Sequence, residues 1–103
     1  MRSLPLIAPA GCTLSPDALA EQFGRASLLA PAVTEVSRSA TGLRVAFGPG
    51  VDDALVDELI ATEQTCCSFL ELGYEGRELQ IESSDPRGPE VMDRLAAYFG
   101  EGR

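Results

Sequence analysis

The pattern of strands and helices in this chain repeats at a spacing of thirty-six positions, and the two copies superpose without a gap. The shift places Glu71 on Glu35 and Leu79 on Leu43, although identities of this kind are few. What recurs is the order strand, strand, helix, and a unit of this kind must bury its apolar face against another. The repeat predicts an α+β fold, in which two ββα units form one four-stranded antiparallel sheet with helices on a single face. Two unrelated ββα units can also share this pattern by chance, so the question of an origin by duplication stays open.

The individual elements are predicted from apolar periodicity, turn residues and helix caps. One helix precedes the repeat, with Ser15 as its N-cap, Pro16 at its first position and Pro31 at its end. Its expected apolar stripe consists of Leu19, Phe23, Ala26 and Leu29. The strands are expected at 33–39, 43–47, 70–74 and 78–82, and the helices of the repeat at about 52–67 and 89–100.

Length and composition favour a single domain. A chain of 103 residues, 45% of them hydrophobic, can fill one compact core without disulfides. We expect one α+β domain over residues 1–103. Residues 1–11 are expected to form an irregular N-terminal arm, because Pro5, Pro9 and Gly11 interrupt regular pairing.

The charge balance excludes two classes of partner. A net charge of −8 would repel both the phosphate backbone of nucleic acids and an anionic membrane surface. No apolar run approaches the length of a bilayer span, and the first ten residues are too short and too rich in proline for a signal core. We therefore expect a cytoplasmic protein with neither a nucleic-acid nor a membrane partner.

Chemically soft side chains gather in one stretch that ends with the adjacent cysteines Cys66 and Cys67. Both thiols continue the apolar stripe of the second predicted helix, and Glu63 lies one turn before them. Burial there would favour the protonated carboxyl group, which could then donate a proton. Consecutive helical residues point about 100° apart, so both thiols can hold one atom only where the helix ends or distorts. A disulfide between neighbours closes a strained ring and is the less expected state.

The third cysteine, Cys12, lies just before the first predicted helix, where a helix N-terminus favours the thiolate. If that helix packs beside the second one, three sulfurs can converge on one ion. Such a site suits mercury(II), arsenic(III) or copper(I), or zinc with Glu63 as fourth ligand. The predicted metal ligands are therefore Cys12, Cys66, Cys67 and Glu63, and no organic cofactor is expected. The alternative is that all three cysteines are small buried hydrophobic residues.

Two segments of the chain, Cys12-Thr13-Leu14 and Glu63-Gln64-Thr65-Cys66-Cys67-Ser68-Phe69-Leu70, together carry a resemblance that spans most of its length. The chain resembles a family of small bacterial proteins with a Glu-x-x-Cys-Cys-x-Phe signature. These proteins are mostly uncharacterised and are often mentioned alongside resistance to mercury or other heavy metals. The resemblance implies that the three cysteines and Glu63 are the positions that matter, and it implies no settled activity. One departure is Ser68, where many members have proline.

Three function classes stay open. The first is a soft-metal or metalloid binder that sequesters or delivers its ion. The second is a thiol enzyme, in which one of the adjacent cysteines is the nucleophile, the other resolves the intermediate and Glu63 relays protons, or in which two thiols and a carboxyl group cleave a carbon–metal bond. Because the chain has no histidine, activation would come from helix ends or from Arg25 and Arg44.

The third class is an interaction module with buried cysteines, which could form a homodimer through a sheet edge. In every case we expect Glu63 to be buried. A buried carboxylate needs a partner, and the available ones are an arginine such as Arg25 or Arg44, a bound cation, or a proton.

Overall fold

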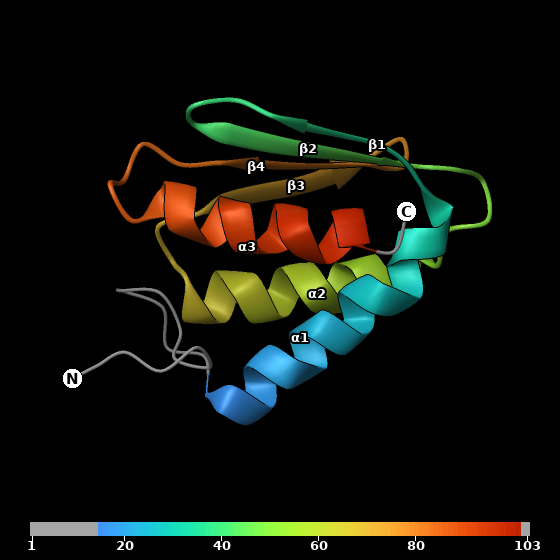
Figure 1. Ribbon diagram of the computed structural model, residues 1–103, viewed down its shortest axis with the longest axis horizontal. Helices are drawn as coiled ribbons and strands as arrows, with labels where there is room; N and C mark the ends of the chain where they lie inside the picture. Colours follow the sequence, from blue (N-terminus) through green and yellow to red (C-terminus); the bar gives the residue numbers. More distant parts are fainter. Residues whose placement is uncertain (1–14, 102–103) are drawn as a thin grey trace.

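The computed structural model describes residues 15–101, apart from the side chains of Cys66 and Glu101. This part of the chain forms three α-helices and one four-stranded antiparallel sheet, as the α+β prediction required (Figure 1). The elements are α1 (Pro16–Leu29), the short 3-10 helix η1 (Ala30–Ala32), β1 (Val33–Arg38), β2 (Gly42–Phe47), α2 (Asp53–Cys66), β3 (Glu71–Glu75), β4 (Glu78–Glu82) and α3 (Gly88–Glu101).

The strand order is β1-β2-β4-β3, so each hairpin supplies one central strand and one edge strand. Pairing within the hairpins repeats at the spacing found in the sequence. In the first hairpin Val36 lies opposite Val45, and thirty-six positions later Leu72 lies opposite Ile81. Pairing register is set by which residues each strand must turn toward the core. The two ββα units therefore share one pairing scheme.

The two hairpins meet where β2 pairs with β4. Leu43 lies opposite Ile81 there, and Val45 lies opposite Leu79. In the repeat Leu43 corresponds to Leu79 and Val45 to Ile81, so interchanging the two units turns one pair into the other. At the centre Arg44 faces Gln80, the residue thirty-six positions after it. An approximate twofold axis thus passes through the sheet at this pair.

The helices of the repeat cover one face of the sheet, and each lies on strands of the other unit. Helix α2 contacts β3, whereas α3 contacts β1 and β2. Figure 1 shows the sheet at the top, α3 and α2 beneath it, and α1 at the bottom. Helix α1 contacts both α2 and α3, and so adds a further layer on the side away from the sheet.

Local sequence accounts for the ends of these elements. The Ser15 hydroxyl accepts a hydrogen bond from the Ala18 amide at the start of α1, and Pro16 follows it, as predicted. The Asp52 carboxylate caps α2 in the same way. Between β3 and β4, Gly76 and Arg77 have φ values of 59° and 61°, the left-handed backbone that a two-residue hairpin turn requires.

Alternation along the strands places the core between the sheet and the helices. The buried hydrophobic residues of the sheet are Leu43, Val45, Phe47, Leu79 and Ile81, and those of α2 and α3 include Val56, Leu59, Val91, Met92, Leu95 and Phe99. No helix within residues 15–101 is long and apolar enough to cross a membrane.

The apolar stripe of α1 differs from the prediction at one position. Leu19, Ala26 and Leu29 are buried, but Phe23 remains 42% exposed, and its ring packs edge to face with that of Tyr98 at a centroid distance of 5.1 Å. The buried position in that turn belongs to Gln22 instead. The spacing of 19, 22, 26 and 29 follows the helical period more closely than a stripe through 23, and so the polar residue faces inward.

Candidate functional site

Glu63 lies in the penultimate turn of α2 and has no exposed surface, which confirms the prediction that it is buried. Its carboxylate accepts hydrogen bonds from two other helices. Gln22 of α1 donates through Nε2 to Glu63 Oε2 at 2.7 Å, and Arg94 of α3 donates through Nη2 to Oε1 at 3.0 Å and to Oε2 at 3.3 Å. A buried carboxylate that accepts these bonds is compensated within the protein. Glu63 thus joins all three helices at one point.

The partner of Glu63 is an arginine, which is one of the three kinds of partner that the sequence left open. It is Arg94, and not Arg25 or Arg44, which were named as examples. Arg44 lies on the outer face of the sheet and pairs with Glu78. Arg25 reaches the cluster only through Gln22.

Gln22 links the buried ion pair to the surface of α1. Besides its bond to Glu63, its Nε2 donates to the Leu59 carbonyl oxygen at 3.1 Å, and its Oε1 accepts from Arg25 Nη1 at 2.6 Å. Arg25 Nη1 also approaches the Thr62 hydroxyl at 3.3 Å, and its Nε lies 3.6 Å from Glu58. The contacts from Arg25 through Gln22 and Glu63 to Arg94 therefore form one hydrogen-bonded chain. It runs from the surface of α1 to the buried interface between the helices.

Arg94 is only partly satisfied. Its side chain is 13% exposed, and its Nε and Nη1 atoms are buried without a hydrogen-bond partner among the described residues. Its guanidinium lies 5.5 Å from the ring centroid of Tyr98, within range of a cation–π contact. Buried donors without partners are rare in folded proteins, so this side of the cluster is its least compensated part.

Cys67 follows α2 directly and is its C-cap residue. Its amide donates to the Glu63 carbonyl oxygen at 2.7 Å, and the Cys67 carbonyl accepts from the Leu70 amide at 3.0 Å. The residue has no exposed surface and belongs to the hydrophobic core. Its sulfur is part of a disulfide. The end of α2 therefore combines a buried, oxidised cysteine with the buried Glu63 one turn earlier.

The other predicted thiols fall outside what the structure describes. Cys12 precedes Ser15, the first described residue, and of Cys66 only the backbone at the end of α2 is described. The predicted convergence of Cys12 with the adjacent cysteines therefore lies outside the described residues. Among the described side chains, which exclude those of Cys66 and Glu101, no group of three or more Cys, Asp or Glu residues is arranged to hold a metal ion.

Two residues of this cluster, Gln22 and Arg94, were not anticipated. Gln22 had a usable signal, because it falls on the helical period of Leu19 and Leu29. Arg94 had a weaker one, since it lies one turn before Tyr98 on α3. Periodicity predicts which face a residue occupies, but it does not predict which polar group from another helix will meet it there.

Comparison with known proteins adds no relative: no protein-family model matches the chain, and no curated protein or solved structure matches it at a significant level. The chemistry of the site therefore has to be inferred from its own residues. The oxygens of the Glu63 carboxylate are already engaged by an arginine and an amide, which suits a supporting role better than proton transfer.

Proposed function

We propose that the reduced protein binds a soft metal or metalloid ion through cysteine thiolates, with Cys67 as one ligand. The observation that carries this proposal is the disulfide at Cys67, since that bond requires a second cysteine sulfur next to it. Reduction of the bond leaves two thiols side by side, the arrangement from which thiolates bind mercury(II), arsenic(III) or copper(I), or zinc with further ligands.

In this proposal Glu63 supports the site and is not an ion ligand. Its carboxylate oxygens already accept hydrogen bonds from Arg94 and Gln22. Holding Glu63 in place fixes the end of α2, where the Cys67 backbone N–H donates a hydrogen bond to the Glu63 carbonyl oxygen. A reducing compartment such as the cytoplasm would keep the cysteines in the form that binds the ion.

Thiol–disulfide exchange is a second candidate function, and the same disulfide favours it. In that reaction an external dithiol would break the bond at Cys67, become a disulfide itself and leave two thiols on the protein. The burial of Cys67 argues against this candidate, because an attacking thiol must reach the sulfur. An ion needs a far smaller opening than a thiol substrate.

Native mass spectrometry of the folded protein tests the proposal. Protein reduced with a phosphine and then freed of it is titrated with mercury(II), arsenite, copper(I) and zinc. We expect one ion per chain in the reduced form and none in the oxidised or alkylated forms. The Cys67→Ser variant should lose the ion, and comparing Cys12→Ser with Cys66→Ser identifies the second ligand.

Two results would contradict the proposal. One is a reduced, folded protein that takes up none of these ions. The other is uptake that persists unchanged in Cys67→Ser. If the cysteines also react with alkylating reagents only after denaturation, the disulfide is a structural cross-link, and the interaction-module interpretation gains support.

A further inference from the structure

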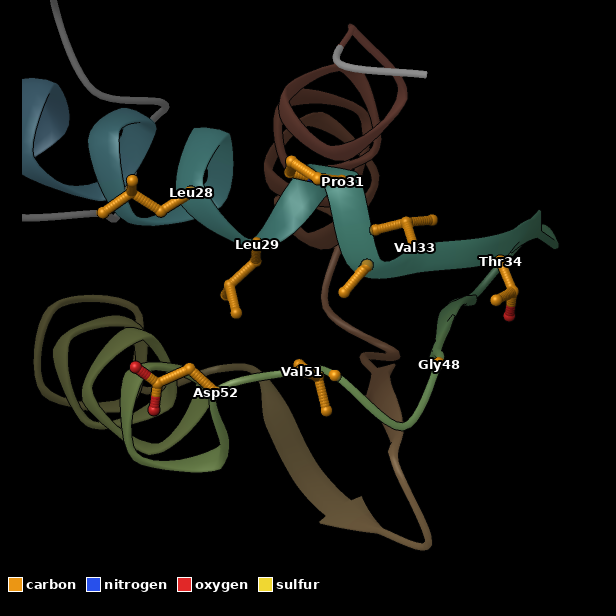
Figure 2. Close-up of a pocket in the computed structure, with 10 residues that line it drawn as sticks. Leu28, Leu29, Pro31, Val33, Thr34, Gly48, Val51 and Asp52 are labelled. Atoms are coloured by element: carbon orange, nitrogen blue, oxygen red, sulfur yellow. The ribbon is translucent and has the colours of Figure 1, made fainter.

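A hollow with a cavity volume of about 470 Å³ lies at the end of α2 opposite Cys67. Leu28 and Leu29 from the end of α1, Val33 from the start of β1, and Val51 from the loop before α2 form apolar walls. Figure 2 shows Leu28 and Leu29 above the hollow and Val51 and Asp52 below it. Among the described residues that line it, Asp52 alone is charged. Its size falls in the range of about 300–1,000 Å³ that small-molecule sites occupy.

Leu28, in one wall of this hollow, is unusually exposed for an apolar side chain. The Leu28 side chain is 73% exposed, although Leu29 next to it is buried. Phe23 is the other large hydrophobic residue that is exposed in the described chain, and it has an aromatic partner in Tyr98. The apolar body of a bound molecule would remove Leu28 from water, which is favourable.

The second ββα unit shows what occupies the equivalent place there. The counterparts of Val33 and Val51, thirty-six positions later, are Phe69 and Arg87. The Arg87 guanidinium lies 4.4 Å from the centroid of the Phe69 ring. It also donates to Asp85 at 2.8 and 2.7 Å, and these bonds lower the pKa of Asp85 to about 2. In that unit the chain itself places a guanidinium cation over an aromatic ring and pairs it with a carboxylate.

The first unit has an apolar surface at these positions but lacks the cation, and its carboxylate, Asp52, is the counterpart of Gly88 and not of Asp85. Valine stands at both positions, and Asp52 supplies the negative charge at the edge of the hollow. The net charge of −8 raises the local concentration of cations and repels anions. We propose that this hollow binds a small organic cation, a protonated amine or guanidinium carried on an alkyl body. The alkyl body lies against Leu28, Leu29 and Val51, and the cationic group lies at the Asp52 carboxylate.

The test compares three probes of equal length on the intact protein: hexylammonium, hexan-1-ol and hexanoate. Binding is followed by NMR shifts of backbone amides. Hexylammonium should shift the amides of Gly48, Gly50, Val51 and Asp52 and should bind more tightly than hexan-1-ol, whereas hexanoate should not bind. Thiol oxidation should not change the result, because the hollow and Cys67 lie at opposite ends of α2.

Substitutions separate the charge from the apolar wall. Asp52→Asn keeps an equally good N-cap while removing the charge, and should weaken hexylammonium binding about threefold, toward the affinity of hexan-1-ol. Leu28→Ser, at an exposed position, should weaken both probes without unfolding the protein. Asp17→Asn, in the first turn of α1, removes one charge elsewhere and should leave binding unchanged.

Three outcomes would overturn the inference. In the first, hexylammonium and hexanoate bind equally well. In the second, the Asp52→Asn and Leu28→Ser variants bind hexylammonium as the unmodified protein does. In the third, the same amides shift with protein concentration in the absence of probe, which would assign the hollow to contact with a second copy of the chain.

Discussion

The two ββα units have the same strand pairing but fill one equivalent buried position in different ways. In α2 that position is Glu63, and thirty-six residues later in α3 it is Phe99; neither has any exposed surface. Phe99 packs edge to face on Phe47 with ring centroids 5.9 Å apart, whereas Glu63 holds an ion pair with Arg94. The comparison teaches that this architecture is compatible with an apolar residue at that position. The charge of Glu63 is therefore a property of one unit and not a requirement of the fold.

The largest expected effect comes from breaking the ion pair on one side. Arg94→Met leaves the Glu63 carboxylate buried with Gln22 as its remaining donor among the described contacts. An uncompensated buried charge is strongly destabilising, so we expect a loss of about 3–5 kcal/mol in the free energy of unfolding. Urea denaturation of the variant and of the unmodified protein measures this difference.

The matched control makes the first unit resemble the second. In the triple variant Gln22→Leu/Glu63→Leu/Arg94→Met the whole buried polar cluster becomes apolar, as it is around Phe99. Replacing a complete buried ion pair is often neutral or stabilising, so the triple variant should be clearly more stable than Arg94→Met. A triple variant no more stable than the single one would mean that the polar cluster is needed for packing of α1.

Two glycines, Gly88 at the start of α3 and Gly50 in the loop before α2, offer a second contrast, with a smaller effect. A Cβ atom on Gly88 would lie 2.7 Å from both Cβ and Oγ of Ser83, which is held by hydrogen bonds to Phe69 and Asp85. Gly88→Ala should therefore cost about 1–3 kcal/mol. Gly50→Ala, in the loop of the first unit, meets no atom within 4 Å and should change stability by less than about 1 kcal/mol. Equal melting temperatures for the two variants would contradict this contrast.

A pH effect distinguishes a third pair of equivalent contacts. The Tyr74 hydroxyl donates to Asp53 at the start of α2, just as Arg38, thirty-six positions before Tyr74, donates to the Pro89 carbonyl at the start of α3. Desolvation, followed by the hydrogen bond to Asp53, raises the pKa of Tyr74 to about 12. The ordinary value is 10.0, so the unfolded chain loses this proton first.

The contribution of Tyr74 to stability is therefore fully present below pH 10 and is lost as the pH rises toward about 12. Denaturation of the unmodified protein and of Tyr74→Phe at a series of alkaline pH values measures it. The variant should lack this part of the alkaline loss, and ultraviolet titration should assign the late ionisation to Tyr74. Identical alkaline profiles would show that the contact has no such effect.

The smallest effect is expected at the twofold axis itself. Arg44→Gln would make the central pair identical, since Gln80 already faces Arg44. The ion pair that it removes, Arg44 with Glu78, lies on the exposed face of the sheet, where ion pairs contribute little. Arg44→Gln and the unmodified protein should have the same melting temperature within error, and added salt should not produce a difference between them.

Sequence alone was sufficient for the architecture because its signals are local and repeated. Alternation at Leu43 and Val45 marks the buried face of β2, and the same alternation at Leu79 and Ile81 marks that of β4. Burial of one face then determines the register. The helix cap at Ser15 was predictable for the same reason, since all of its parts lie within a few residues.

The candidate site was predictable only in part. Burial of Glu63 followed from its place on the helical stripe of Ile60 and Cys67, but the identity of its partner did not. Arg94 lies thirty-one positions away on another helix, and nothing local distinguishes it from Arg25. The contact depends on how α1, α2 and α3 pack, and helix packing is a property of the assembled fold.

Each helix of the repeat packs on strands of the other unit, and this has a consequence for how the chain folds. Each hairpin joins neighbouring segments and can form early, but α2 finds its covering strand in β3, which follows it, and α3 returns to β1 and β2. A nascent chain that ends at Cys67 would hold a helix whose strand partner has not yet been made. Cooperativity between the halves is thus built into the topology, and two separately produced halves would each expose an apolar face that only the other can cover.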